Sequence, residues 1–450
     1  MTLAHIGLPM LPTPMNPTSD MSHSCLNEVE ILPRSLTATQ RYPASVTEQD
    51  PEQTAGALDG VRVIERSETP AGAYCGRLLA GMGAAVTMIE PSEGSSIRRK
   101  GPFRDDTPDR EGGASHLHLN RHKRSLRLDL RTAAGRRLLE SQLATADVLV
   151  IDTERRQWSK FGVDPHALRR RHPQLHVCTI TPYGLEGPKA HWLGSELTLY
   201  AAGGYLGIGG EPHREPVKAW GEQGHLQAGL HAALGVVAAL QASGEDEESA
   251  GQSIDTAVCD ALAFLLGGGY QHAWFFDHDP VRNGARLVGF GPGHLYPSTI
   301  RPCADGWVHA HCNNRYPEAM AVLFDEPRLA ERDLLGELMG HADEVDELMA
   351  PRLMQTSRRE MVQRAQEMRI PFTEVLAPSE VMSDIDGHHA SREFWQSTPH
   401  PRGGAYLAPG PAVRFGKNGW NDGSAPELGQ DNDRLGTPAE CARWRRAGVA

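Results

Sequence analysis

The sequence is short of three things: cysteine, long apolar runs and positive charge. Its 450 residues include only 7 cysteines, which are scattered and form no Cys-X-X-Cys pair. This pattern argues against a disulfide framework and against a cysteine-based zinc site, and a reducing cytoplasm suits it best. The formal net charge of −12 argues against general nucleic-acid binding.

No stretch is long and apolar enough to span a bilayer. The nearest candidate, residues 226–242, is short and contains Gln227, His231 and Gln241, so we expect a helix buried on most sides. The chain begins without the basic-then-apolar pattern of a signal peptide. Residues 1–55 are rich in Pro, Ser and Thr without sustained periodicity, which predicts a disordered tail. We therefore expect no membrane partner.

Short apolar runs alternate with helical patterns from residue 58 onward, which is typical of an α/β fold with a parallel sheet. The expected strands are 61–64, 86–89, 125–130, 148–151 and 175–180, and the expected helices include 70–79, 133–144, 226–242 and 254–266. An Asp-Gly turn between 300–303 and 307–312 predicts a β-hairpin. Helical segments over 316–368 and short strands at 370–375 and 412–415 follow.

The first strand–helix–strand unit invites comparison with dinucleotide-binding folds. Its first loop, ERSETPAG, holds one glycine instead of the GxGxxG pattern that lets the backbone approach a pyrophosphate. Glu90 imitates the ribose-binding acid of such folds, but a Glu at the end of a strand is a weak signal alone. We therefore expect no nicotinamide or flavin site.

Histidines gather at two places, residues 116–122 and 309–311. Neither group has a further ligand at useful spacing, so we expect no metal site and interpret the first group as surface histidines.

Basic residues surround Asn120 just before the expected strand 125–130. Arg121, Lys123 and Arg124 lie there, and Arg98 stands in the preceding loop region. Local positive charge on an acidic protein indicates an anion site, and the fork of Arg donors suits phosphate. A solvated basic turn explains the same pattern equally well, and the residues alone leave both interpretations open.

Glu196 stands at the predicted start of a helix. It follows the expected strand 175–180, a loop rich in Gly and Pro, and Ser195, a good N-cap residue. A carboxylate in the first helical turn feels the positive end of the helix dipole and stays ionised, which makes it a candidate nucleophile or base. The plain alternative is a surface Glu that favours a helix start.

Twelve short segments, in this order, carry a family resemblance: LDGVRVIE, AGAYCGRLLAGMGAAVTMIEP, Arg98 with Gly101-Pro102, LNRHKRSLRLDL, ITPYGLEGP, GSELTLYAAGG, AGLHAALGVVAAL, GQSIDTAV, ADGW, RIPFTEV, ASREFW and APELGQ. From about residue 58 to 430 the chain resembles the class III CoA-transferases, of the formyl-CoA and carnitine CoA-transferase type. That family also includes the α-methylacyl-CoA racemases.

The resemblance implies a Rossmann-like parallel-sheet large domain built from both chain ends, a smaller α+β domain and two subunits that interlock. The resulting division is a tail at 1–55, the large domain at 56–266, a linker with a glycine-rich flap at 267–293, the small domain at 294–385, and a return to the large domain with a C-terminal tail at 386–450. It further implies an acyl-CoA and a small carboxylic acid as partners. Coenzyme A then acts as a thioester substrate, with no permanently bound cofactor.

The resemblance also assigns residues. Glu196 takes the position of the family's Asp nucleophile. The residues assigned to CoA binding are Gly72, Arg98, Asn120, Lys123 and Arg124, and the flap glycines are Gly289, Gly291 and Gly293. Besides Glu196, the chain departs from the family pattern at Ser95, where Asp is usual, and at His225, where Asp is frequent.

Three functions follow as hypotheses. A CoA-transferase would use Glu196 as the nucleophile that forms an acyl anhydride, with the flap amides stabilising the oxyanion. An acyl-CoA racemase on the same fold would need an acid–base pair across the α-carbon. A catalytically silent homologue would bind CoA only.

Overall fold

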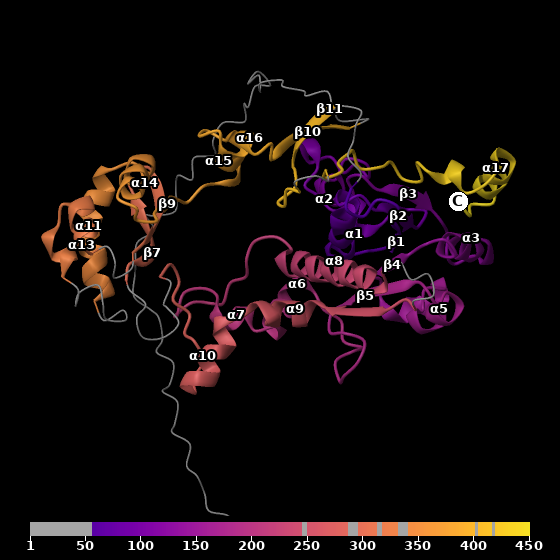
Figure 1. Ribbon diagram of the computed structural model, residues 1–450, viewed down its shortest axis with the longest axis horizontal. Helices are drawn as coiled ribbons and strands as arrows, with labels where there is room; N and C mark the ends of the chain where they lie inside the picture. Colours follow the sequence, from indigo (N-terminus) through magenta and orange to yellow (C-terminus); the bar gives the residue numbers. More distant parts are fainter. Residues whose placement is uncertain are drawn as a thin grey trace, which may run out of the picture. The chain divides into compact units, whose positions relative to one another are not determined.

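Six parallel strands form the central sheet of the computed structural model, which describes residues 56–244, 250–286, 296–312, 317–331, 341–400, 404–415 and 419–450. Their order across the sheet is β3-β2-β1-β4-β5-β6 (Figure 1). The strands are β1 (Arg62–Arg66), β2 (Ala85–Glu90), β3 (Arg124–Arg127), β4 (Val148–Ile151), β5 (His176–Thr181) and β6 (Ser253–Ala257). This is the order of a doubly wound sheet, so the predicted parallel α/β fold is confirmed.

Helices connect these strands and follow them. They are α1 (Pro70–Gly81), α2 (Ala114–Leu119), α3 (Ala133–Leu143), α4 (Trp158–Phe161), α5 (Pro165–Arg171), α6 (Glu196–Ala202), α7 (Tyr205–Ile208), α8 (Gln223–Ser243), α9 (Val258–Leu265), α10 (Gly268–Phe276) and, near the C-terminus, α17 (Pro438–Arg446). Local sequence sets several of the starts. The side chain of Asp164 accepts from an amide of α5, just before Pro165 at the first helical position, as predicted.

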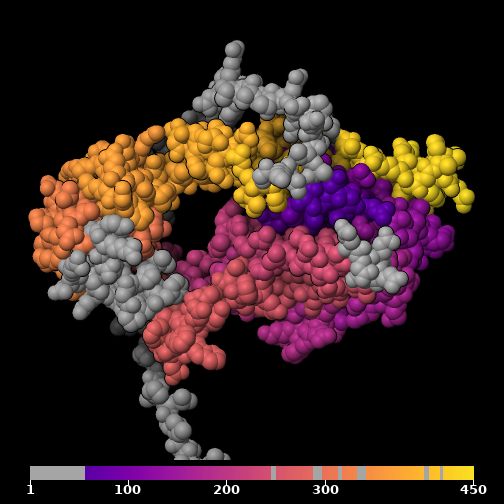
Figure 2. Space-filling view, viewed as in Figure 1, coloured from indigo at the N-terminus to yellow at the C-terminus, as the bar shows by residue number. Residues whose placement is uncertain are grey.

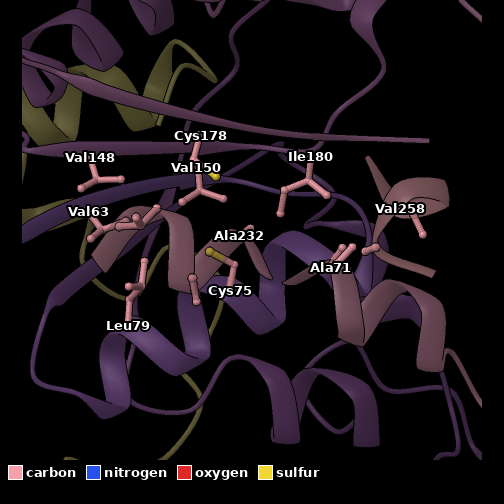
Figure 3. Packing of buried hydrophobic residues seen from close by; sticks show 14 of the residues in the cluster. Val63, Ala71, Cys75, Leu79, Val148, Val150, Cys178, Ile180, Ala232 and Val258 are labelled. Carbon is pink, nitrogen blue, oxygen red and sulfur yellow. The ribbon is translucent and has the colours of Figure 1, made fainter. Parts of the chain in front are cut away.

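The sheet has an apolar core on each face because successive strand residues point to opposite sides. On β1, Val63 belongs to one core and Ile64 to the other. Figure 3 shows the first core, where Leu79 of α1 and Ala232 of α8 lie among the strand side chains. The sheet therefore lies between two layers of helices.

Among the helices that the structure describes, α8 is the one long and apolar enough to cross a membrane, judged by length and composition only. Its small residues pack on α1: a Cβ added at Gly229 would lie 2.5 Å from the carbonyl oxygen of Ala71. Leu230 and Leu234, by contrast, are exposed. Exposure is thus limited to one stripe of the helix, and its other sides contact α1, α9, β5 and β6, so the expectation of a helix buried on most sides holds except along that stripe.

A second, antiparallel sheet contains β7 (Ser298–Cys303), β8 (Gly306–His311) and β9 (Thr373–Glu374). The predicted hairpin is confirmed. Helices α11 (Pro317–Phe324), α13 (Ala342–Gln355) and α14 (Arg358–Glu367) lie beside this sheet in Figure 1. They share with it a separate apolar core that includes Val308, Met349 and Phe372. These elements lie within the predicted small domain, whose boundaries stay a prediction.

The chain beyond residue 377 contains α15 (Pro378–Ser383), α16 (His388–Ser391) and an antiparallel pair, β10 (Trp395–His400) with β11 (Gly404–Pro409). Its last part contacts the edge strand of the large sheet. The Ser125 amide donates to Asp431 over 3.0 Å, and the Arg127 amide donates to Asn432 over 2.9 Å. The C-terminal segment therefore packs on residues from the first third of the chain.

Two predicted elements are wrong. Residues 254–266 do not form one helix, because Ser253–Ala257 is strand β6, paired with β5, and α9 begins only at Val258. The β-branched residues Ile254 and Thr256 suit the sheet, and the pairing overrides the apolar pattern that resembled a helix. Residues 412–415 are not a strand, since the pairing partner of β10 is Gly404–Pro409 instead.

Three further segments differ in extent. The strand expected at 125–130 ends at Arg127, and the strand expected at 370–375 has only two residues. The linker expected at 267–293 begins with the helix α10. The expected flap, with Gly289, Gly291 and Gly293, and the expected tail 1–55 lie outside the described residues.

Candidate active site

Glu196 is the first residue of α6, as predicted. Its N-cap residue Ser195 and Thr198 cap each other reciprocally, and the Ser195 amide donates to Thr198 Oγ1 over 2.8 Å. Gly194 lies against Pro182, the first residue after β5. These local contacts hold the start of α6 next to the carboxyl end of β5, an edge at which α/β proteins commonly bind ligands.

The Glu196 carboxylate accepts three hydrogen bonds from the beginning of α8. The Gly224 amide donates to Oε1 over 2.8 Å, and the His225 amide donates to Oε2 over 3.2 Å. Nδ1 of His225 lies 2.5 Å from Oε2. Because an ionised carboxylate only accepts hydrogen bonds, this nitrogen carries the proton that it donates.

This position gives Glu196 two helix N-termini at once. It lies in the first turn of α6, and it binds the free amides of the first turn of α8, a helix of 21 residues. The N-cap residue of α8, Glu222, makes no capping bond with its side chain, so Glu196 supplies that acceptor from a different helix. Both helix dipoles favour negative charge on Glu196.

The environment keeps Glu196 ionised. Burial by itself would raise the pKa of Glu196, but the hydrogen bonds from the His225 side chain and from the Gly224 and His225 amides hold the pKa below its ordinary value of 4.5. The side chains of Glu196 and His225 are 11% and 12% exposed. The site therefore presents a charged carboxylate that is largely shielded from water, which can act as a nucleophile or a base.

Gly224 has a steric reason to be glycine. A Cβ at this position would lie 3.2 Å from the ring of Tyr200 and 3.3 Å from Oε2 of Glu196. Because glycine has no Cβ, the first turn of α8 can come close to the Glu196 carboxylate.

Arg98, predicted to bind CoA, is completely buried and surrounded by acceptors. Its guanidinium donates to Glu90 over 2.7 and 2.8 Å, to Glu111 over 2.6 Å and to the carbonyl of Pro426 over 3.0 Å. Burial would raise the pKa of Glu90, but the hydrogen bond and charge of Arg98 lower it to about 2. In this structure Arg98 ties β2 to the C-terminal segment.

Lys123 and Asn120 are also buried and lie together. Nζ of Lys123 is 2.8 Å from Oε2 of Glu65, and it donates to the Ala73 carbonyl over 2.7 Å and to Asn120 Oδ1 over 3.0 Å. The interpretation of this region as a solvated basic turn is wrong, because Arg121 and Lys123 are both buried. Arg124, by contrast, is exposed.

Gly72 lies at the beginning of α1, where its amide donates to Asp152 Oδ2 over 2.9 Å. The same carboxylate oxygen accepts from the amide and the hydroxyl of Thr69. A Cβ at Gly72 would lie 2.5 Å from that oxygen. The helix terminus beside β1 and β4, which binds a pyrophosphate in dinucleotide-binding folds, is thus occupied by a carboxylate of the chain itself.

The structure therefore separates the predicted residues into groups. Arg98, Asn120 and Lys123 lie in one buried region, Arg124 is at the surface, and Glu196 meets His225. Within the described ranges no three His, Cys, Asp or Glu side chains are placed to hold a metal ion.

His116 was expected at the surface, but it is buried. Its Nε2 lies 3.0 Å from Arg98 Nη1, and its Nδ1 lies 2.9 Å from Asn120 Nδ2. Burial, with the charge of Arg98, lowers its pKa from 6.5 to about 3. The unfolded chain then binds a proton at pH values where the folded protein does not. Stability from this histidine is complete above pH 6.5 and is lost as the pH falls towards 3, by about 1.4 kcal/mol per pH unit.

The corresponding measurement is the free energy of unfolding in urea at pH 7, 6 and 5 for the wild type and His116→Asn. We expect the wild type to lose stability more steeply over this range than the variant. Equal slopes would contradict the assignment of a neutral His116 in the folded protein.

Two residues of these sites were missed as partners: Asp152 and His225. Asp152 follows the apolar strand β4 directly, a position from which a carboxylate reaches the carboxyl edge of the sheet, and this pattern was a usable signal. His225 had no such local signal, because its partner lies 29 residues away in the sequence.

Comparisons with known proteins agree with this architecture. Residues 58–432 match the family model described as CoA-transferase family III. A succinate–glutarate CoA-transferase of Agrobacterium fabrum is 28% identical over 340 residues, which cover 73% of this chain and 82% of that protein. A subunit of succinyl-CoA:(R)-benzylsuccinate CoA-transferase of Thauera aromatica is 28% identical over 376 residues, covering 80% and 88%.

A solved structure shows the same fold. The crystal structure of a CaiB/BaiF family protein from Brucella suis superimposes with a TM-score of 0.74 at 24% identity, covering 86% of this chain and all of that one.

Proposed function

The chain belongs to CoA-transferase family III, and we propose that it transfers coenzyme A from an acyl-CoA thioester to a carboxylic acid. The observation that supports this most is the ionised, shielded carboxylate of Glu196 at the beginning of two helices. This is the residue type and state that nucleophilic attack on a thioester requires.

The proposed reaction starts with attack of Glu196 on the thioester carbonyl carbon. A carbon–oxygen bond forms, the carbon–sulfur bond breaks, and CoA leaves as the thiolate, so that a mixed anhydride remains on the enzyme. The thiolate then attacks the glutamyl carbon, which releases the first acid and leaves CoA on Glu196. The acceptor carboxylate repeats these two steps in reverse order and leaves as the new acyl-CoA. No proton or electron enters or leaves over the whole cycle.

For the substrates, we propose succinyl-CoA as the first donor to test. The names of several relatives contain succinate or succinyl-CoA, with aliphatic or aromatic acids as the other substrate. A small panel of monocarboxylic and dicarboxylic acids would then identify the acceptor.

We assign the CoA contact to Arg124 and the predicted flap, and a bracing role to Arg98, Asn120 and Lys123. These three residues are buried and already form hydrogen bonds within the protein, whereas Arg124 is exposed beside them. Gly72 would contribute by allowing Asp152 to approach the start of α1.

The racemase hypothesis finds less support. A racemase needs an acid and a base on opposite sides of the substrate α-carbon. Glu196 and His225 contact each other directly over 2.5 Å, so no substrate carbon fits between them.

The test is to incubate the protein with a panel of acyl-CoAs, trap with hydroxylamine or borohydride and locate the modified residue by mass spectrometry. We expect modification of Glu196, together with transfer of CoA to an added acid. Exchange of the α-proton without modification would indicate racemisation instead. Binding of CoA with neither reaction would indicate a silent homologue.

The family resemblance also leads us to propose an interlocked homodimer. Large apolar side chains are exposed on α9 and α10, including Phe264, Trp274 and Phe275, and α10 lies open at the surface in Figure 2. Exposed apolar surface of this kind marks interfaces. Light scattering coupled to gel filtration is expected to give about twice the chain mass of 49.1 kDa. A monomer at micromolar concentration would contradict the proposal.

We further propose a cytoplasmic location. The structure shows no disulfide bond at Cys75, Cys178, Cys259, Cys303 or Cys441, which suits a reducing compartment.

A further inference from the structure

We propose that His225 makes the two oxygens of Glu196 unequal: Oε1 attacks the thioester, and Oε2, held by His225, takes up the negative charge when the glutamyl carbon is attacked. His225 is then a residue that stabilises the oxyanion on the enzyme's own side of the anhydride. The inference rests on the function proposed above and names a residue to which that function assigned no role.

The two oxygens of Glu196 differ in the number of hydrogen bonds that they accept. A carboxylate oxygen has two lone pairs in the plane of the group. Oε2 receives two donors, the amide and Nδ1 of His225, at 3.2 and 2.5 Å. Oε1 receives one donor, the Gly224 amide at 2.8 Å. Oε1 therefore keeps a lone pair for attack, whereas Oε2 has both of its lone pairs engaged.

All three donors to Glu196 are fixed on the first turn of α8. Two of the three are backbone amides in the first turn of the 21-residue α8, and the third is a side chain fixed on the same turn. The carboxylate and the imidazole are both largely buried. Donors that are already oriented in a shielded site stabilise developing charge without reorganisation.

During the proposed reaction, negative charge develops on Oε2 of Glu196. In the mixed anhydride Oε1 is the bridging oxygen, and Oε2 is the carbonyl oxygen of the glutamyl group. When the thiolate attacks the glutamyl carbon, a carbon–sulfur bond forms and the carbonyl electron pair moves to Oε2. Collapse then breaks the bond to Oε1, which leaves with the released acid. Attack of the acceptor acid on the glutamyl thioester places charge on Oε2 again, so His225 acts twice in each cycle.

Two variants of similar size separate the donor from the fold. His225→Asn keeps an N–H donor near the place of Nδ1, and His225→Leu removes it. For His225→Leu we expect kcat to fall by about 100-fold or more, the loss typical of one oxyanion donor, with a KM for the acyl-CoA within about threefold of wild type. For His225→Asn we expect kcat within about tenfold of wild type. His231→Leu, on the same helix with its ring against Phe264, serves as the matched control with unchanged kcat.

A trapping experiment measures directly how fast CoA-bound Glu196 forms. Each protein is mixed with acyl-CoA alone, quenched with borohydride at fixed times, and the reduced form of Glu196 is quantified by mass spectrometry. We expect CoA-bound Glu196 to form more slowly in His225→Leu by the same factor as kcat, and His225→Asn to recover the rate. Wild-type kcat in His225→Leu, or an equal loss in the Asn variant, would overturn the inference. If the wild type itself forms no trapped Glu196 with any acyl-CoA, the proposed function fails instead, which is a different result.

Discussion

Replacement of Glu196 by Gln is expected to lower the transfer rate by about 10⁴-fold or more, the scale of loss when a covalent nucleophile is removed. The amide cannot form the anhydride, and one of its ends must present N–H groups to the donors of α8. The measurement is the initial rate of acyl-CoA formation with a fixed acceptor acid. Trapping with borohydride should leave residue 196 unmodified.

Glu196→Asp is the matched control, because it keeps the charge and moves the carboxylate back by one methylene. A displacement of about an ångström costs on the order of 100-fold when the surrounding groups are fixed. Asp should therefore retain activity that Gln lacks, and both variants should unfold within about 1 kcal/mol of wild type, the usual weight of one helix cap. Turnover by Glu196→Gln at the wild-type rate would exclude Glu196 as the nucleophile.

Lys123→Met is expected to destabilise the fold by about 3–5 kcal/mol, since it leaves Glu65 as an unpaired charge in the core. Burial raises the pKa of Glu65 and lowers the pKa of Lys123, and each group opposes the shift of the other by its charge. Both side chains are fully buried. The measurement is the free energy of unfolding in urea at pH 7.

Two variants make this result specific. Adding Glu65→Gln to Lys123→Met removes the second charge, and the double variant should recover much of the lost stability. Arg124→Gln, at the exposed neighbouring position, should change stability by no more than about 0.5 kcal/mol but should raise the KM for acyl-CoA. A Lys123→Met protein of wild-type stability and raised KM would show that Lys123 binds CoA and does not brace the fold.

The features predicted well from the sequence depend on near neighbours. Ser195 and Glu196 begin α6 as predicted, and Asp164 begins α5, because capping depends on residues within about one helical turn. The strand cores were found from apolar runs such as 148–151. The failure at 254–266 is of a different kind. An apolar run favours helix and strand alike, and only pairing with β5 decides for the strand.

The sequence alone determined the α/β class, the family resemblance and the choice of Glu196 as the residue to examine. Tertiary structure decided what surrounds that residue and what the basic residues do. His225 is 29 positions from Glu196, Asp152 is 83 from Thr69, and Pro426 is 328 from Arg98, so no local pattern pairs them. The physical reason is that a charge takes its role from its solvation and its partners, both of which arise only when distant segments pack together.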